Sequence, residues 1–286
     1  MIGLVVVLIW AVVALFAPVI APPAEGQHAT MMLRPTFSAI PLPPNASSWF
    51  GTTGGGYDIF YGIVWGSRTA FVVGLITVFF TALIGVTLGA VGAYLGGMAD
   101  YLTMRLVDLF MSIPFIIAVI VMTVALGKGL DKIILALIVF GWPAYARVIR
   151  SEVLSIKQRD YVLAAKLAGA SPWHILMRHV MPNSIYPIIV LMSINIGRIV
   201  LIAASMSFIG IGTEPGYADW GQLLNYARNW LSGVQGDPFR YWYTYLYPSM
   251  AVFSFVLGWT FLGDSLRALA RPRVVSFPRV ALFFLR

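Results

Sequence analysis

The chain has 286 residues, of which 59% are hydrophobic and only 10% are charged, and its mean hydropathy is +0.85. A soluble domain carries about 25% charged residues, so this composition excludes an ordinary water-soluble protein and predicts a polytopic membrane protein. The net charge of +8 is expected from Lys and Arg in loops on the cytoplasmic side rather than from nucleic-acid binding. Because the chain has no Cys, it has neither a disulfide framework nor a thiolate metal site.

The N-terminal residues 1–21 form an apolar run without a charged side chain. The run lacks the basic start of a signal peptide and is too long for its apolar region. As a helix it would span about 30 Å, the thickness of the hydrocarbon core. We therefore predict that residues 1–21 are a retained first transmembrane helix.

Five more segments are long and apolar enough to be predicted as spans. Backbone groups in lipid must be paired internally, which favours helices, and no ten-residue alternating pattern of a barrel is present. The predicted fold class is all-α, with six transmembrane helices. The five further spans are residues 69–98, 107–126, 133–146, 184–209 and 243–266.

The distribution of Lys and Arg predicts the orientation of these spans. With the N-terminus inside, the cytoplasmic segments hold twelve basic residues and the outer segments hold six. This bias predicts that both termini are cytoplasmic. The predicted organisation is an outer segment at 22–68, a transmembrane domain at 69–273 and a tail at 274–286; within the domain lie a cytoplasmic loop at 147–183 and an outer loop at 210–242.

The cytoplasmic stretch "YVLAAKLAGASPWHILMRHVMPN" (161–183) has the pattern of two short helices. One face of the first helix is nearly flat, because small side chains recur there at helical spacing. Gly169 can end this helix in the left-handed conformation. The residues on that face are Tyr161, Ala164, Ala165 and Ala168.

The second short helix is predicted to begin with Ser171 as its N-cap and Pro172 in its first turn. Pro182 is expected to end it before the fifth span. The pattern alone leaves two interpretations open: a hairpin that binds another protein, and an amphipathic hairpin that lies on the membrane surface.

The segment "AAKLAGASPWHILMRHVMPN" resembles the cytoplasmic EAA loop of permease subunits in binding-protein-dependent ABC importers. In that family the loop is a coupling helix that docks on an ATPase subunit. The sequence departs from the family at Leu163, where Glu is usual, and at Lys166, where Arg is common. The residues predicted to act in coupling, from the flat helix face and from the resemblance together, are Tyr161, Leu163, Ala164, Ala165, Lys166, Ala168, Gly169, Ala170, Ser171 and Arg178.

Further motifs in the correct order are similar to the dipeptide/oligopeptide/nickel subgroup, and to its second, C-type permease. Thr53, Tyr57 and Gly62 depart from an Asp and two Arg of that subgroup. The matching motifs are "GTTGGGYDIFYGIVWGSR" (51–68), "MRLVDLFMSIPF" (104–115), "GWPAYARVIRSEVL" (141–154), "SFIGIG" (207–212), "DWGQLL" (219–224) and "FLGDSLRALARPR" (261–273).

The resemblance implies a type I ABC importer permease in the cell (inner) membrane of a prokaryote. Its expected partners are a homologous second permease, two ATPase subunits, an extracytoplasmic substrate-binding protein and membrane lipid. ATP and Mg would bind in the ATPase subunits, and this chain would hold no cofactor. Peptides, oligosaccharides and nickel chelates are all open as substrates.

Ser193, Asn195 and Arg198 are polar residues near the middle of the fifth predicted span. An Arg at the bilayer centre costs about 2.5–3.5 kcal/mol on insertion scales, so it is expected to face the bundle interior or water. Two roles remain open: lining a translocation pathway, or bonding to a neighbouring helix.

The outer stretch "DWGQLLNYARNW" (219–230) is predicted, from Leu223, Leu224 and Ala227, to include a short amphipathic helix that lies in the membrane interface. We expect the outer loop to cover the pathway and to meet the binding protein, although a loop that merely caps the bundle is an equal alternative. The expected contact residues are Asp219, Trp220, Gln222 and Arg228.

No catalytic or metal site is predicted. "GTTGGG" lacks the Gly-Lys-Ser/Thr ending of a phosphate-binding loop. His28, His174 and His179 are widely spaced and are predicted to lie on two sides of the membrane. Two other classes of protein remain as alternatives, an ion-coupled secondary transporter and a non-transporting membrane scaffold. The first predicts inverted repeats, and none is evident.

Overall fold

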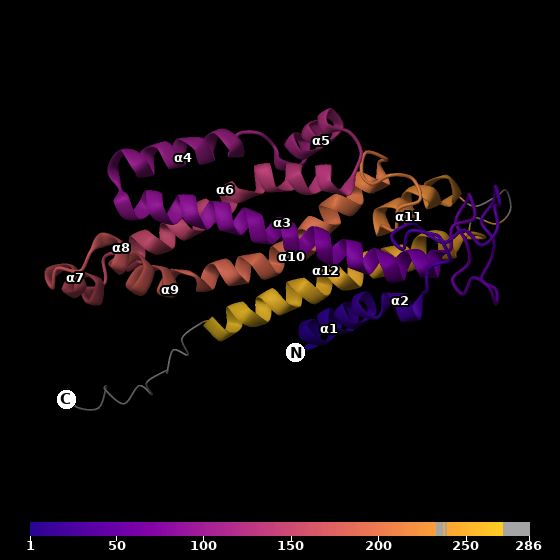
Figure 1. The fold of residues 1–286 in the computed structure, drawn as a ribbon, viewed down its shortest axis with the longest axis horizontal. Coiled ribbons are helices and arrows are strands. Elements are labelled where there is room, and N and C mark those ends of the chain that lie inside the picture. The colour runs from indigo at the N-terminus through magenta and orange to yellow at the C-terminus, as the bar shows by residue number, and fades with distance from the viewer. Residues whose placement is uncertain (233–236, 238, 271–286) are drawn as a thin grey trace, which may run out of the picture.

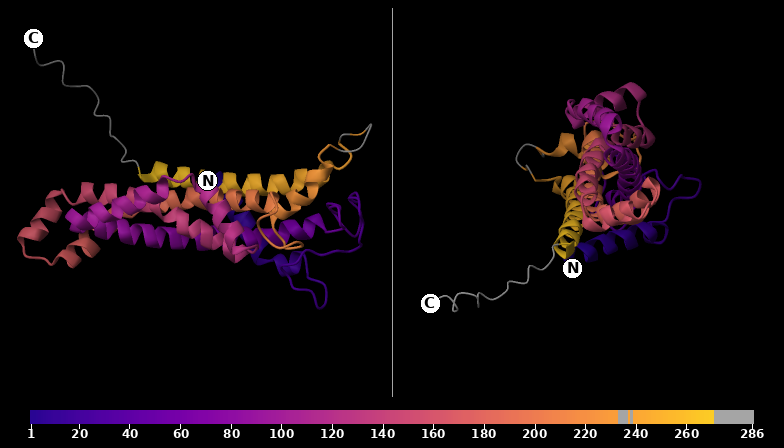
Figure 2. Two further views of the ribbon diagram at one scale, coloured as in Figure 1. Left: turned by 90° about the horizontal axis from the view of Figure 1, so that it is seen from above. Right: turned by 90° about the vertical axis from the view of Figure 1, so that its left-hand side faces the viewer.

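The computed structural model describes residues 1–232, 237 and 239–270. Within these ranges the regular elements are helices, and extended segments meet only in isolated bridges. The helices lie roughly along one direction and form an elongated bundle (Figures 1 and 2). The all-α prediction is confirmed, while the predicted tail at 274–286 lies outside the described residues.

Among the described residues, four helices are each long and apolar enough to cross a membrane. They confirm the second, fourth, fifth and sixth predicted spans, with shifted ends. Their bounds are α3 Ile59–Leu95, α6 Leu130–Ile156, α10 Tyr186–Phe208 and α12 Trp242–Ala270.

The second and fourth predicted spans are shorter than the helices α3 and α6 to which they correspond. Helix α3 begins ten residues earlier, because the Asp58 carboxylate caps it by accepting a hydrogen bond from the Tyr61 backbone N–H at 2.8 Å. Part of the predicted outer segment is therefore helical. Helix α6 extends through Pro143 to Ile156, so the start of the predicted cytoplasmic loop is also part of this helix.

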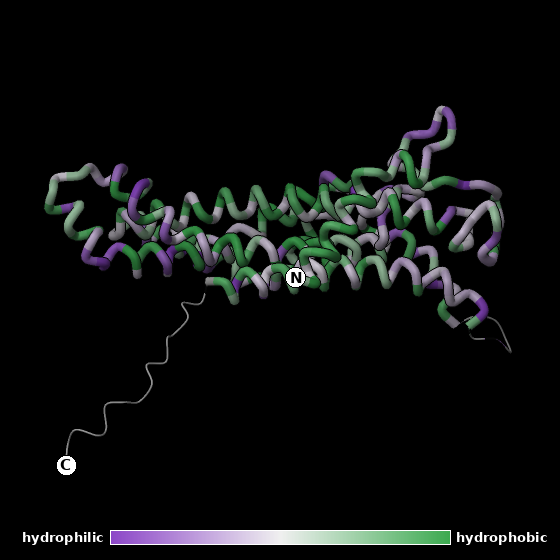
Figure 3. The backbone as a smooth tube through the Cα atoms, turned by 90° about the horizontal axis from the view of Figure 1, so that it is seen from below, coloured by the Kyte–Doolittle hydropathy of each residue, from purple (hydrophilic) through white to green (hydrophobic). Residues whose placement is uncertain are grey.

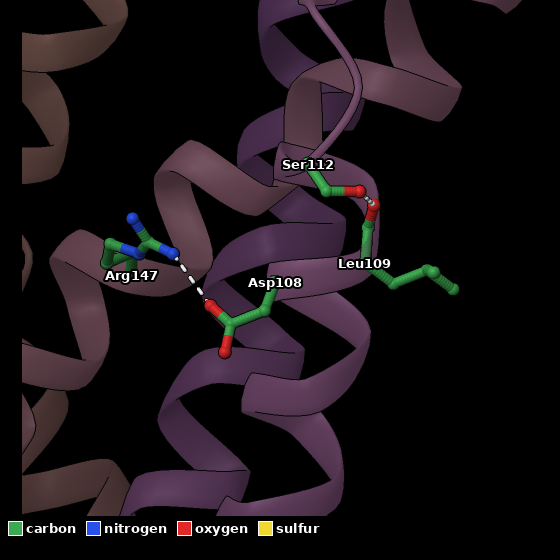
Figure 4. A network of polar contacts seen from close by, with 4 residues as sticks. All are labelled: Asp108, Leu109, Ser112 and Arg147. Carbon is green, nitrogen blue, oxygen red and sulfur yellow. Dashed lines mark hydrogen bonds and ion pairs between the residues drawn. The ribbon is translucent and has the colours of Figure 1, made fainter.

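The third predicted span is not one helix. It consists of α4 (Gly97–Met111) and α5 (Phe115–Leu126), which are bent by 79° across a break of three residues. Pro114 causes the break, because proline lacks a backbone N–H and disfavours helix at the preceding residue. The Ser112 hydroxyl donates to the Leu109 carbonyl at 2.7 Å and binds one of the carbonyls at the end of α4 (Figure 4).

The first predicted span is divided into α1 (Ile2–Leu15) and α2 (Ala17–Ile20), with Pro18 at the start of α2. The 14 residues of α1 extend for only about 21 Å, less than the hydrocarbon thickness of about 30 Å. The prediction of six full-length spans is therefore replaced by four long helices, one bent pair and this short apolar helix.

The remaining short helices gather at the two ends of the bundle (Figure 1). One end holds α7 (Asp160–Leu167), α8 (Pro172–Ile175), the π-helical turn η1 (Leu176–Val180) and α9 (Met181–Ser184). The opposite end holds residues 22–58, α11 (Trp220–Ala227) and the 3₁₀ turn η2 (Arg228–Trp230). Hydrophilic residues concentrate at these ends, and hydrophobic residues dominate between them (Figure 3).

Helices α3 and α6 pack against each other at very short range. A Cβ atom at Gly85 would overlap the Trp142 carbonyl oxygen, and one at Gly89 would overlap the Ala146 carbonyl oxygen. The Tyr145 Cβ atom lies 2.7 Å from the same ideal Cβ position at Gly85. Only glycine permits this backbone approach, which gives dispersion contact along both helices.

Replacing Gly85 with Leu should therefore separate α3 from α6. Overpacking of a close contact typically costs about 1–3 kcal/mol, and here the obstacle is backbone. We expect the variant to lose thermal stability or to aggregate in detergent, as measured by size-exclusion chromatography with thermal ramping. Thr87→Leu adds similar bulk on the exposed face of α3 and should behave like the wild type; equal behaviour of the two variants would contradict the packing argument.

Candidate functional site

The first candidate site is the hairpin at one end of the bundle, and its turn has the geometry of a Schellman motif. The Ala170 N–H donates to the Ala165 carbonyl at 3.2 Å, and the Gly169 N–H donates to the Lys166 carbonyl at 3.1 Å. Gly169 has a φ of 80°, and no atom lies within 4 Å of a Cβ built there. The predicted left-handed turn at Gly169 is confirmed.

The second arm of the hairpin begins as predicted. The Ser171 hydroxyl accepts a hydrogen bond from the His174 backbone N–H at 3.3 Å, and Pro172 occupies the first turn. The prediction that Pro182 ends this arm is wrong. The chain stays helical to Ser184, because the π turn that precedes Pro182 widens the spacing of the backbone bonds where proline lacks a donor.

The hairpin is anchored to the bundle by buried apolar side chains. Val162, Ile175, Leu176 and Val180 are all buried. Next to it, the Lys157 ammonium donates to the Tyr94 carbonyl at the end of α3, at 2.6 Å. The hairpin therefore has a fixed base, and a load on its exposed surface would be transmitted to the helices.

The exposed surface of the hairpin carries all ten residues predicted to act in coupling. Eight of them are exposed, and Ala165 and Ala170 are half-buried. Sequence reasoning missed three large apolar side chains on the same surface, Leu167 (89% exposed), Trp173 (65%) and Met177 (50%). Trp173 directly follows the predicted start of the second helix. A large aromatic side chain at this position was the sequence signal that could have indicated the apolar surface. Exposed apolar groups of this size are typical of a binding surface.

Two ion pairs join α4 to α6 on the side of the bundle near the hairpin. Arg150 binds Asp100 through two hydrogen bonds of 2.6 and 2.7 Å, and Arg147 Nη2 lies 2.9 Å from Asp108 Oδ1 (Figure 4). The fork of the guanidinium matches the two carboxylate oxygens of Asp100. These pairs hold the first half of the bent span against α6.

The second candidate site is a cavity of about 260 Å³ beside the bend between α4 and α5. Helices α3, α6 and α10 line its other sides, and the cavity is partly open. Asn195 Nδ2 donates to the Tyr145 hydroxyl at 3.0 Å across the wall formed by α6 and α10. The lining includes Thr81, Pro114, Tyr145, Asn195 and Arg198.

The three residues predicted for the pathway are divided by the structure. Asn195 and Arg198 line the cavity, whereas Ser193 is buried elsewhere in α10 and its hydroxyl has no hydrogen-bond partner in the described part of the chain. Tyr145 and Pro114 were not predicted as lining. The proline within an apolar run was a signal for the bend, and nothing in the sequence places Tyr145 beside Asn195.

The outer contact residues predicted from the sequence also differ in their exposure. Trp220 is buried, donates through Nε1 to the Ile63 carbonyl at 3.0 Å and contacts the Trp10 ring at a centroid distance of 5.0 Å. Gln222 is buried and bonds to two loop carbonyls. Arg228 is exposed. Helix α11 is thus confirmed as a short helix, but it packs into the bundle rather than along the interface.

Asp219 is the N-cap of α11. One carboxylate oxygen accepts from the Gly221 N–H at 3.1 Å, and the other accepts from the Thr213 hydroxyl at 3.3 Å. Burial raises the pKa of the Asp219 carboxyl above its ordinary value, although these hydrogen bonds act in the opposite direction. Asp219 therefore fixes the start of the outer helix.

The histidines do not form a metal site. The rings of His174 and His179 are 5.9 Å apart, while His28 belongs to the segment at the other end of the bundle. Among the residues that the structure covers, no cluster of three or more His, Cys, Asp or Glu could hold a metal ion.

An apolar helical bundle with an exposed hairpin at one end and a cavity between its helices has the architecture expected of a membrane permease. The chain belongs to the family described as binding-protein-dependent transport system inner membrane component, whose family model matches residues 81–276. Membership in this family excludes the two alternative classes, an ion-coupled secondary transporter and a non-transporting scaffold.

Curated relatives have similar sequences over most of this chain. The probable D,D-dipeptide transport system permease protein DdpC of Escherichia coli (strain K12) is 36% identical over 232 residues, which cover 81% of this chain and 76% of that protein. The glutathione transport system permease protein GsiD of Pectobacterium atrosepticum is 36% identical over 82% of this chain and 75% of its own length. The dipeptide transport system permease protein DppC of Alkalihalophilus pseudofirmus is 31% identical over 96% and 86%.

Solved structures share the fold. A chain of the inward-facing MetNI methionine ABC transporter aligns with a TM-score of 0.58 and 22% identity, over 74% of this chain and 98% of that chain. A chain in the crystal structure of an amino acid ABC transporter with histidines aligns with a TM-score of 0.53 and 16% identity, over 73% and 94%. The predicted type I importer permease fold is confirmed.

The cap at Asp219 gives a testable prediction about the stability of the outer helix. Asp219→Ala removes the acceptor for the Gly221 N–H and should cost about 1 kcal/mol, which lowers the thermal midpoint in detergent. Asp219→Asn retains the cap and should cost less.

The same pair of proteins tests the raised pKa. A raised pKa in the folded state means that the folded state binds the proton more tightly than the unfolded state does. The free energy of unfolding of the wild type should therefore increase relative to that of Asp219→Asn as the pH falls from about 7 toward the ordinary pKa of 3.8. Thermal unfolding of both proteins across this range measures the difference. A constant difference would contradict the assigned burial.

Proposed function

We propose that this chain is one of two permeases in an ATP-driven importer of peptides or related small solutes. The names of its relatives support this substrate class. A homologous second permease would supply the other half of the pathway, and an extracytoplasmic binding protein would deliver the solute. The chain itself would be non-catalytic, with ATP and Mg bound in two partner ATPase subunits.

The observation that carries this proposal is the exposed hairpin with its buried base. Its flat arm, around Ala164 and Ala168, allows close approach by another surface, and Leu167 and Trp173 provide exposed apolar area. We assign this surface to docking on an ATPase subunit. A load applied there would reach α6 and α10, because the hairpin connects these two helices along the chain.

The cavity is assigned to the translocation pathway, with Asn195 and Arg198 as the lining residues from the predicted set. Ser193 is not included. On the outer side, Arg228 is exposed and would contact the binding protein. The other three predicted contact residues, Asp219, Trp220 and Gln222, would act indirectly by holding α11 in place.

We infer that the hairpin end is cytoplasmic, that residues 22–58 and α11 face outward and that both termini are inside. The distribution of Lys and Arg supports this orientation. The membrane would be the inner membrane of a prokaryotic cell; the family description, which names an inner membrane component, and the bacterial relatives support this location.

The complete importer provides the direct test. The chain is expressed with its partners, reconstituted in liposomes and assayed for ATP-dependent uptake of dipeptides, oligosaccharides and nickel chelates. We expect uptake of peptides, dependent on the binding protein. Uptake without ATP and an ATPase partner would overturn the proposal, and uptake of only another solute would correct the substrate class.

The orientation can be tested by cysteine labelling, because the natural chain has no Cys. Lys157→Cys, beside the hairpin, should react with an impermeant maleimide only after the cells are opened. Ser47→Cys, in the exposed outer segment, should react in intact cells. The reverse pattern would invert the topology and exclude the hairpin as an ATPase contact.

Gly169→Val should uncouple the hairpin without unfolding the bundle. A β-branched residue at a φ of 80° is strained by about 1–2 kcal/mol, but no neighbouring atom obstructs its Cβ. We expect a normal yield of monodisperse permease, several-fold loss of co-purified ATPase and loss of coupling between ATP turnover and uptake.

Gly169→Asn is the matched control, because Asn tolerates the left-handed conformation better than a β-branched residue. It should retain more of the ATPase than the Val variant retains. Full retention of ATPase and coupled transport by Gly169→Val would refute the coupling assignment.

A further inference from the structure

The cavity beside the bent span is lined mainly by apolar side chains, and its polar groups are concentrated on one wall. Tyr145, Asn195 and Arg198 lie on this polar wall, among apolar residues of α6 and α10, whereas Pro114 and Phe115 line the cavity from the bend. Its volume of about 260 Å³ lies below the usual range of about 300–1,000 Å³ for pockets that enclose small molecules. The cavity therefore suits one end of a solute rather than a whole peptide.

Arg198 supplies the charge of this cavity. No hydrogen bond or ion pair joins its side chain to another side chain in the described part of the chain. The neighbouring guanidinium of Arg147 is already paired with Asp108 at 2.9 Å. The end of α4 and the start of α5 both border the cavity, so their opposite partial charges offset each other. Among the described residues that line the cavity, Arg198 alone carries a charge, so the lining favours an anion.

Hydrogen-bond donors beside Arg198 favour an anion with acceptor oxygens. Asn195 Nδ2 donates one of its two hydrogens to the Tyr145 hydroxyl at 3.0 Å, which leaves the second hydrogen for another acceptor. Tyr145 is only 2% exposed, so its packing also holds the Asn195 amide in place. A guanidinium fork with a fixed amide donor beside it matches a carboxylate.

We propose that this cavity is a carboxylate-binding station of the pathway, in which Arg198 and the Asn195 amide hold the carboxylate of a passing peptide. This inference rests on the proposed importer function. The apolar wall at the bend would then contact the side chain or methyl groups next to that carboxylate. A neutral sugar offers hydroxyl acceptors but no negative charge to pair with Arg198, and a cationic metal complex would be repelled by it.

The first experiment measures the charge selectivity of the cavity in the assembled importer. Ala144, an exposed residue of the lining, is replaced by Cys in the naturally Cys-free chain. Reaction rates of anionic and cationic methanethiosulfonates with this Ala144→Cys protein are followed by the mass of the subunit. We expect the ratio of anionic to cationic rates to fall about tenfold with Arg198→Gln, and to change little with Arg198→Lys.

Ser47→Cys is the matched control, and its rate ratio should not respond to Arg198→Gln. An unchanged ratio when Arg198→Gln is added to the Ala144→Cys protein would overturn the assignment of the positive field to Arg198.

The second experiment identifies the anion by protection of the thiol in the Ala144→Cys protein. A dipeptide with a free carboxylate should slow the labelling, the same dipeptide as a carboxamide should not, and Arg198→Gln should abolish the difference. Equal protection by the two forms would overturn carboxylate recognition. Protection by vesicles containing phosphatidylglycerol, with none by the dipeptide, would assign the cavity to an anionic lipid and overturn the proposal.

The two experiments separate this inference from the importer function. Loss of ATP-dependent uptake by the wild-type complex would refute the proposed function whatever the labelling shows. Normal peptide uptake, together with a ratio of anionic to cationic labelling rates at Ala144→Cys that does not depend on Arg198, would refute only the carboxylate station.

Discussion

The close contact between α3 and α6 determines where the other functional parts lie. Lipid offers little hydrophobic drive for helix association, so spans associate through dispersion contacts and small residues at the interface. Gly85 and Gly89, four residues apart, let the α3 backbone touch that of α6 at Trp142 and Ala146. Between these two positions α6 presents Tyr145 to the cavity. The glycines therefore fix the wall of the polar site as well as the packing.

Charged groups within the spans are accommodated in two different ways. Asp100 and Arg150 neutralise each other through paired hydrogen bonds and join α4 to α6. Arg198 instead lines a cavity. An unpaired charge is costly in hydrocarbon, and a lining position lets water or a solute replace the missing partner. This contrast distinguishes a structural ion pair from a group available to a ligand.

The hairpin is connected directly to both helices of the polar wall. Helix α6, which carries Tyr145, leads into it, and α10, which carries Asn195 and Arg198, leaves it. Its base is buried, and its tip presents apolar and small side chains. A movement of the hairpin relative to α3 would therefore alter the relative positions of the two sides of the cavity. Such a connection joins an external source of force to a site within the membrane.

The sequence by itself determined the properties that depend on local composition. Long apolar runs predicted helical spans, because an unpaired backbone is not tolerated in lipid. Gly169 and Ser171 predicted the hairpin turn and its cap, since these depend only on neighbouring backbone groups. The resemblance of this hairpin and of the further motifs to known permeases also predicted the family that the comparison confirmed.

Only the tertiary structure decided the features that depend on contacts between distant residues. It placed Asn195 beside Tyr145, divided the predicted third span at Pro114 and turned Trp220 inward against Trp10. Hydropathy reports how apolar a segment is but not which neighbour it meets. A polar residue in a span has the same sequence signature whether it is packed, as Ser193 is, or lines a cavity, as Arg198 does. The physical difference between them is the arrangement of the surrounding helices.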